Sequence, residues 1–144
     1  MKKMSWLGLR LAMGLIFLWA FVDKLVGLGY ATKSENSWLN GGSPTSGFLT
    51  NATRGPFVEF FQGLSGLSIS GVNVIDWLFM LGLLGVGLTL MLNRLVVWGA
   101  LAGSVMLLLM YLAVFPPANN PFIDDHIIYI LVLAVIALRS KENR

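Results

Sequence analysis

Four apolar stretches separated by polar segments dominate the pattern of this chain. They cover residues 6–28, 72–92, 95–115 and 122–138. The first three are long enough to cross a hydrocarbon layer of about 30 Å as helices, at a rise of about 1.5 Å per residue. Because backbone groups that face lipid have no water to bond, each crossing segment is predicted to be helical.

The fourth stretch is shorter than the others. Its unbroken apolar run at 127–138 would extend only about 18 Å as a helix, which is too short to cross a bilayer alone. To span, this helix must begin near Phe122 and take Asp124, Asp125 and His126 into or just below the headgroup region. We therefore predict one all-α membrane domain, a four-transmembrane-helix bundle with a long extracytoplasmic loop at 29–71.

The loop at 29–71 is rich in Gly, Ser, Thr and Asn, but it also holds an aromatic segment. Pro56 suits the first turn of a helix. Four apolar residues recur after it at helical spacing: Phe57, Phe60, Phe61 and Leu64. We expect a short amphipathic helix that lies on the outer membrane surface or caps the bundle. A lid over a binding site, or a docking surface for another subunit, is the alternative.

Small residues concentrate in the second and third apolar stretches, which a very short connection at Asn93 and Arg94 joins into an antiparallel hairpin. Glycines allow helix backbones to approach closely. They serve either packing inside the bundle or a face for a second subunit, and they are Gly82, Gly85, Gly87, Gly99 and Gly103.

Composition narrows the class of protein. Of 144 residues, 56% are hydrophobic and only 12% are charged, which leaves too little polar surface for a water-soluble particle and excludes a disordered chain. The net charge of +3 is scattered, so we expect membrane lipids as partners and no nucleic acid. The chain has no cysteine and one histidine, so we expect no haem, iron–sulfur cluster or metal site from it alone.

The distribution of positive charge predicts the orientation. Basic residues precede the first stretch, separate the second from the third and follow the fourth: Lys2, Lys3, Arg94, Arg139, Lys141 and Arg144. The other side has only Lys33 and Arg54. Because Lys and Arg accumulate on the cytoplasmic side, both termini are predicted to be cytoplasmic.

The first stretch places one polar stripe along a helix. Positions 10, 14, 17, 21 and 24 share a face, so this stripe is expected to face the bundle or a ligand rather than lipid. Arg10 either extends to lipid headgroups or turns inward and holds a quinone headgroup, an anion or an acidic partner. Phe17, on the same stripe, is a candidate ligand contact.

A second polar group gathers near the outer ends of the predicted helices. Alternating topology brings six residues to one side of the bundle: Asp23, Lys24, Asp76, Asp124, Asp125 and His126. Since one lysine cannot neutralise four carboxylates, some acids face water or hold protons. Two explanations stay open. The group is a functional site, or its acids are helix caps with Asn73, Asn120 and Pro121 as neighbours.

Within this group, chemistry would fall to a few side chains. We assign candidate catalytic roles to Asp125, His126 and Lys24, because His126 beside Asp125 and near Tyr129 could relay protons to or from a quinol. Candidate cofactor-binding residues are Arg10, Phe17, Asp23, Asp76 and Tyr129. A solvated histidine at the interface is the alternative.

The first stretch contains Arg10, Gly14, Phe17, Ala20 and Lys24-Leu25 in an R-x3-G-x2-F…A…K-L pattern. This pattern resembles the DoxX/DoxD family of small four-helix prokaryotic membrane proteins. The loop sequences Gly42-Ser-Pro44-Thr-Ser-Gly-Phe48 and Gly55-Pro56-Phe57 look like the DoxD branch, the small subunit of thiosulfate:quinone oxidoreductase. Phe21 departs from the glycine that the family often has there, and the polar C-terminal signature of many members is missing.

The resemblance implies a prokaryotic inner-membrane subunit that serves a quinone-linked oxidoreductase. Electrons would pass from a reduced sulfur compound to membrane quinone, with a partner subunit on the outer face. Two other functions stay open: a non-catalytic accessory subunit of a larger membrane complex, and a small-solute carrier. The carrier is disfavoured because the chain shows no internal repeat or broken-helix pair.

Overall fold

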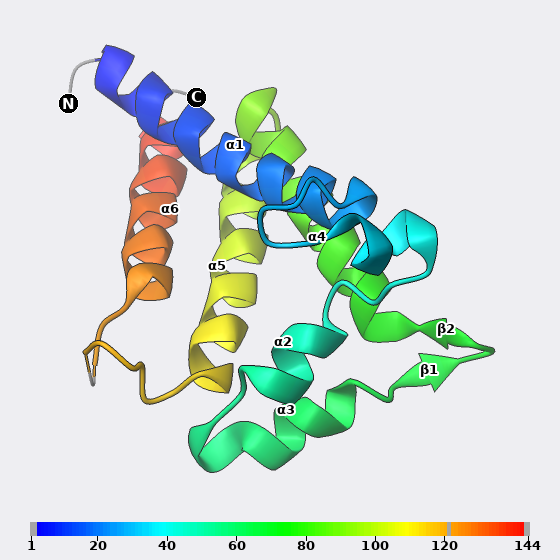
Figure 1. Ribbon diagram of the computed structural model, residues 1–144. Coiled ribbons are helices and arrows are strands. Elements are labelled where there is room, and N and C mark those ends of the chain that lie inside the picture. The colour runs from blue at the N-terminus through cyan, green and yellow to red at the C-terminus, as the bar shows by residue number, and fades with distance from the viewer. Residues whose placement is uncertain (1–2, 121, 143–144) are drawn as a thin grey trace.

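The computed structural model describes residues 3–120 and 122–142 and is mostly helical (Figure 1). Its long helices are α1 (Lys3–Val26), α4 (Val74–Met91), α5 (Val96–Ala113) and α6 (Asp125–Glu142). Three residues used in the sequence predictions lie outside the described residues: Lys2, Pro121 and Arg144.

Three of these helices, α1, α4 and α5, are long and apolar enough to cross a membrane. Within their most apolar segments only 22% to 33% of the residues are buried. Large apolar side chains such as Leu81, Trp98 and Leu101 are exposed instead. Because a water-soluble monomer rarely exposes so much contiguous apolar surface, these faces contact lipid.

Helix α6 differs from the three apolar helices. It begins at Asp125 and carries Arg139 and Lys141 in its last turn. The expectation that it begins near Phe122 is wrong by three residues. Asp124 accepts a hydrogen bond from the amide of His126 and so acts as the N-cap of the helix. The helix instead extends past Leu138 toward the C-terminus. That α6 crosses the membrane stays a prediction.

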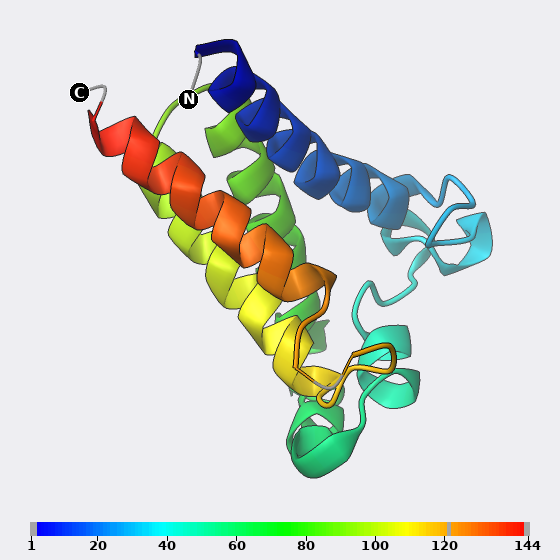
Figure 2. The ribbon, with the colours of Figure 1, turned by 90° about the vertical axis from the view of Figure 1, so that its left-hand side faces the viewer.

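The helices pack in two layers that share one core. Helix α4 runs antiparallel to α1 on one side and to α5 on the other, and α6 lies along α5 (Figure 2). Residues from α4 and α6 are fully buried at their centre: Met80, Leu90, Leu133 and Ile136.

Glycines set the distance between these helices. A Cβ atom on Gly87 would lie 2.6 Å from Leu18, and one on Gly99 would collide with the hydroxyl of Thr89. Gly103 faces Phe17, Val86 and Leu133, whereas Gly85 has no neighbour within 4 Å. Packing inside the bundle is therefore confirmed for Gly87, Gly99 and Gly103.

The segment between α1 and α4 is folded. It holds the 3-10 turns η1 (Ser34–Asn36), η2 (Trp38–Asn40) and η3 (Gly55–Phe57), the short helices α2 (Ser46–Asn51) and α3 (Val58–Leu64), and the strands β1 (Ser68–Ile69) and β2 (Val72–Asn73). The strands pair antiparallel, with Ser68 opposite Asn73. The predicted short helix is confirmed as η3 and α3. Its Phe61 packs on Leu49 and Ala113, so this helix covers the end of the bundle.

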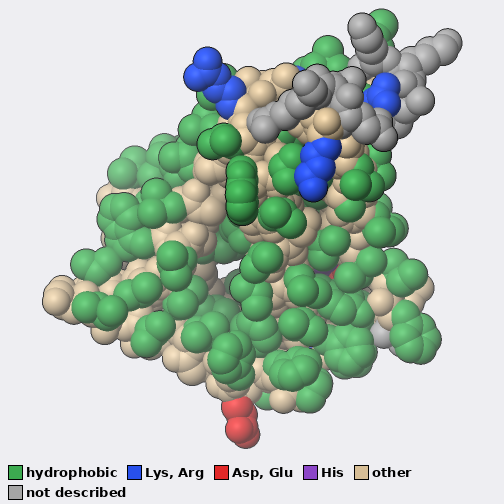
Figure 3. Space-filling model, turned by 180° about the vertical axis from the view of Figure 1, so that it is seen from behind, with side chains coloured by type: hydrophobic (Ala, Val, Ile, Leu, Met, Phe, Trp, Pro, Cys, Tyr) green, Lys and Arg blue, Asp and Glu red, His purple; other side chains and the backbone are tan. Residues whose placement is uncertain are grey.

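The two ends of the bundle differ in charge. We call the end with the start of α1, the α4–α5 turn and the end of α6 the termini end, and the opposite end the loop end. Basic side chains gather at the termini end, and a broad band of hydrophobic side chains separates them from an acidic side chain at the loop end (Figure 3). This asymmetry agrees with the sequence distribution of Lys and Arg.

Candidate functional site

Asp23 is fixed by the turn that follows α1. Only 1% of this residue is exposed, and its carboxylate accepts hydrogen bonds from the amides of Ala31 at 3.0 Å and Tyr30 at 3.4 Å. The turn is possible because Gly27 has a φ of +72° and passes close to Ser34. Asp23 is therefore occupied in holding the loop onto the end of α1.

Asp76 binds the same loop farther along the chain. It is 4% exposed, and one carboxylate oxygen accepts hydrogen bonds from the Ser43 hydroxyl at 2.8 Å, the Thr45 hydroxyl at 2.6 Å and the Thr45 amide at 3.1 Å. The predicted helix cap is Asn73, whose side chain accepts from the amides of Ile75 and Asp76. Asp76 is thus a tertiary anchor that joins the loop to the first turn of α4.

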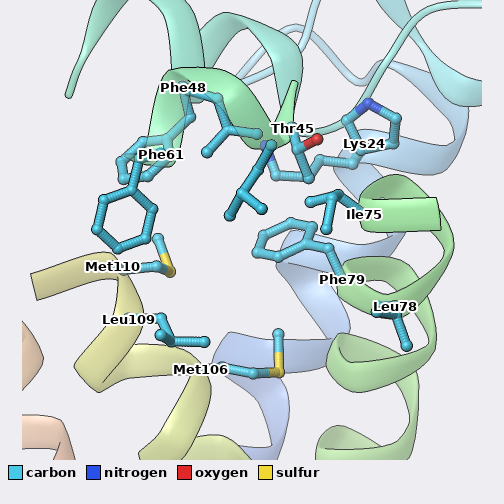
Figure 4. A pocket seen from close by; sticks show the side chains of 13 residues that line it. Lys24, Thr45, Phe48, Phe61, Ile75, Leu78, Phe79, Met106, Leu109 and Met110 are labelled. Carbon is cyan, nitrogen blue, oxygen red and sulfur yellow. The ribbon is translucent and has the colours of Figure 1, made fainter. Parts of the chain in front are cut away.

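Between this anchored loop and the helices lies a cavity of about 270 Å³. Its floor comes from α4 and α5 and its roof from α2 and α3, as Figure 4 shows. Its walls are aromatic, aliphatic and thioether groups except for Lys24 and Thr45; the main ones are Phe48, Phe61, Phe79, Met106 and Met110. We call this the Lys24 cavity.

Lys24 enters the cavity from α1. In Figure 4 its side chain extends beside Thr45 and above Phe79, and its ammonium lies 5.9 Å from the centre of the Phe79 ring. Among the described residues, no carboxylate lies within ion-pair distance of the Lys24 ammonium. The cation therefore lines an apolar cavity, where it lies over the face of Phe79 and is attracted by the Asp23 carboxylate from beyond ion-pair distance.

Arg10 and Phe17 lie away from this cavity, in the packed half of the bundle. Arg10 is 5% exposed; its guanidinium donates to the carbonyls of Leu90 and Met91 at the end of α4 and stacks on Trp6 at 5.2 Å. It neutralises the negative end of that helix. Phe17 belongs to the hydrophobic core. The stripe does face the bundle, but these two side chains contact protein.

The polar residues at the start of α6 form hydrogen bonds with near neighbours in the sequence. Asp124 caps the helix through the amide of His126 at 3.0 Å, and its other oxygen lies 2.7 Å from His126 Nδ1. The partner of His126 is therefore Asp124, where the sequence had suggested Asp125, which is exposed. Tyr129 packs beside the core.

The structure thus distributes the predicted site residues over three places. Lys24 lines the cavity, and Asp23 and Asp76 hold the loop next to it. Arg10 and Phe17 lie in the packed half. Asp124, Asp125, His126 and Tyr129 line neither this cavity nor a second pocket of about 580 Å³ along α1, which Asp23 and Lys24 also line. Among the described residues, no hydrogen bond or ion pair joins the α6 group to the Lys24 cavity.

Sequence reasoning missed most of the residues that form the cavity. Ser43, Pro44 and Thr45 stand in a loop without periodicity, so nothing local indicates that they reach Asp76. In the sequence, Met106 and Met110 look like ordinary apolar residues of a membrane helix. Their spacing of four does place them on one face, which is the only signal that could have suggested a shared surface.

Comparisons with protein-family models, with curated proteins and with solved structures find no match to this chain. The described residues also contain no group of three or more His, Asp or Glu side chains that could hold a metal ion. The chemistry of the candidate site must therefore be argued from the Lys24 cavity itself.

Proposed function

We propose that this protein is a membrane subunit that binds quinone for a quinone-linked oxidoreductase, with the Lys24 cavity as the quinone site. The observation that carries the proposal is the cavity's composition: apolar and aromatic walls with one ammonium donor. A quinone headgroup is a flat ring with carbonyl oxygens, so it needs aromatic surfaces on its faces and a hydrogen-bond donor at its edge.

The opening of the cavity suits a ligand that arrives through the bilayer. Leu78 of α4 and Leu109 of α5 line it and are also 62% and 47% exposed on the lipid-facing surface. A headgroup could therefore pass between these side chains while its isoprenoid tail stays in lipid. In this arrangement Lys24 contacts the quinone, and Thr45 and Asp76 position the roof.

The source of electrons would be another subunit. The chain has no cysteine and one histidine, so it offers few ligands for a redox centre of its own. The resemblance to the DoxX/DoxD family suggests a reduced sulfur compound as the donor. We place the partner subunit at the loop end, where the loop and the connection between α5 and α6 expose apolar residues: Phe57, Phe60, Leu67 and Phe122.

In the membrane we place α6 as a fourth span. Its 18 residues would extend about 27 Å at about 1.5 Å per residue. Asp125 would lie at one interface, and Arg139 and Lys141 at the other. Both termini would then be cytoplasmic in the inner membrane of a prokaryotic cell, with the loop outside.

Quinone retention tests the proposal. The protein would be purified in native-lipid particles, and its quinone content measured after extraction. We expect wild type to retain quinone and Lys24→Met, which keeps the aliphatic stem but removes the charge, to lose about tenfold in affinity. The control is Lys33→Met, an exposed loop lysine that leaves the cavity intact. Equal retention by the two variants would contradict the proposal.

A second candidate is a non-catalytic accessory subunit. It is favoured by the engagement of Asp23, Asp76 and Asp124 in loop anchoring and helix capping. If this function is correct, replacing Lys24 leaves quinone content and assembly of the complex unchanged. Gly99→Leu, which disrupts helix packing, would then abolish assembly.

A further inference from the structure

The positive charge of Lys24 also bears on which ligands other than a neutral quinone the cavity can bind. Asp23, the residue before Lys24, attracts its ammonium from beyond ion-pair distance while its carboxylate accepts two backbone amides, and Asp76 accepts from Ser43 and Thr45. Within the described residues the Lys24 ammonium has no carboxylate in ion-pair reach. A cation in apolar surroundings is costly unless an anion accompanies it.

The ring of Phe79 compensates for only part of that cost. A cation–π contact is weaker than a charge-assisted hydrogen bond combined with a full counter-charge. A neutral ligand would leave the ammonium with Asp23, beyond ion-pair distance, and with no direct counter-ion. A ligand that carries a carboxylate would supply one and would place its apolar part against Phe48, Phe61 and Met110.

We propose that the Lys24 cavity also binds a long-chain fatty acid. Its carboxylate pairs with Lys24, and its chain leaves between Leu78 and Leu109 into the bilayer. This inference uses the same cavity as the quinone proposal but does not depend on it.

The size of the cavity favours a single-chain acid over a phospholipid. A space of about 270 Å³ lies beneath the roof of α2 and α3. A carboxylate at the end of one chain can enter between two side chains of the lipid-facing surface. A glycerol-linked phosphate carries two chains and a bulkier headgroup, which would have to pass the same opening.

Binding of carboxyl-labelled oleate to the purified protein, in particles made of zwitterionic lipid, tests the inference. NMR of the labelled carboxyl group reports whether the bound acid is ionised. We expect saturable binding of oleate and at least about tenfold weaker binding of methyl oleate, which has the same chain without the charge. Equal binding of the acid and its ester would overturn the inference.

Variants locate the site. Lys24→Met should weaken oleate binding by about tenfold and leave methyl oleate binding unchanged, whereas Lys24→Arg, which keeps the charge, should stay within about threefold of wild type. Leu78→Trp should weaken binding by narrowing the opening, and Leu81→Trp, on the same helix outside the cavity, should not. Oleate binding that is insensitive to Lys24→Met contradicts the inference.

Two further outcomes distinguish fatty-acid binding from phospholipid binding and from quinone binding. Displacement of oleate by an equal concentration of dioleoylphosphatidylglycerol would assign the site to phospholipid phosphate and overturn the fatty-acid proposal. Protein that retains no quinone but binds oleate through Lys24 would overturn the quinone proposal alone. The failures of the two proposals are therefore distinguishable.

Discussion

The two ends of this bundle use the same helices in opposite ways. At the termini end, α1 meets α4 through Gly14 and Gly87, and Arg10 closes the end of α4 by hydrogen bonds to its last carbonyls. At the loop end, large side chains hold the helices apart around the Lys24 cavity, and a loop tied to Asp76 covers it.

The difference lies in what fills the space between helices. Glycines let backbones touch, so the termini end is closed by the helices themselves. The loop end contains phenylalanine and methionine at the corresponding interfaces, and part of its volume is left open. The same helices thus form a closely packed half and a half that contains a cavity.

The largest expected effect concerns the anchor of the loop end. Asp76→Ala removes the acceptor of three hydrogen bonds and leaves the buried donors of Thr45 and the partly buried hydroxyl of Ser43 unpaired. We expect a loss of about 3 kcal/mol in the free energy of unfolding and faster proteolysis of the loop. Unfolding in mixed micelles measures the first, and Asp125→Ala, at an exposed carboxylate, is the control. A loss below that of the control would mean that Asp76 does not anchor the loop.

The next effect concerns the packed half. Gly99→Ala places a methyl group against Thr89, so the free energy of unfolding should fall by about 2 kcal/mol through overpacking. Gly85→Ala, in the neighbouring helix, meets nothing within 4 Å and should be neutral or slightly stabilising. Thermal unfolding of both variants measures the difference. Equal melting temperatures would contradict close packing at Gly99.

Replacing Arg10 should destabilise the same packed half of the bundle. Arg10→Met keeps an apolar side chain but leaves the carbonyls of Leu90 and Met91 without their donor. We expect a loss of about 1.5 kcal/mol in stability and no change in ligand binding at the loop end. Arg94→Met, at an exposed arginine next to the same helix end, is the matched control. A loss of quinone in Arg10→Met would instead support the predicted headgroup contact.

The smallest effect belongs to the start of α6. Asp124→Ala removes a helix cap and the partner of His126, which should lower stability by about 1 kcal/mol. Asp125→Ala, one residue farther, should change it by less than about 0.5 kcal/mol. Ligand binding should be unaffected by either change. If quinone binding fell in both, the α6 group would belong to the site and the division of the molecule into two halves would be wrong.

The fold was predictable where one local signal decides it. The length and hydropathy of the first three apolar stretches predicted α1, α4 and α5, and helical spacing after Pro56 predicted α3. The start of α6 was missed by three residues, because the sequence offers Asn120 and Asp124 as possible caps. Only their geometry shows that Asp124 is used.

The candidate site was predictable only in part. Lys24 stands out as a lysine inside an apolar helix, and it does line the cavity. The anchor between Asp76 and Thr45 joins residues 31 positions apart through a loop without periodicity, so no pattern indicates it. The sequence also grouped the acids of α4 and α6 by their common depth, which says nothing about their separation within the membrane plane.

Photo-crosslinking tests the central claim most directly. A quinone analogue with a photoreactive ring would be added to the protein in native-lipid particles, and the labelled residues identified by mass spectrometry. The account predicts labels on Phe48, Phe79 and Met110, lost in Lys24→Met. Labels on His126 and Tyr129, or scattered over the lipid-facing surface of α4 and α5, would contradict it.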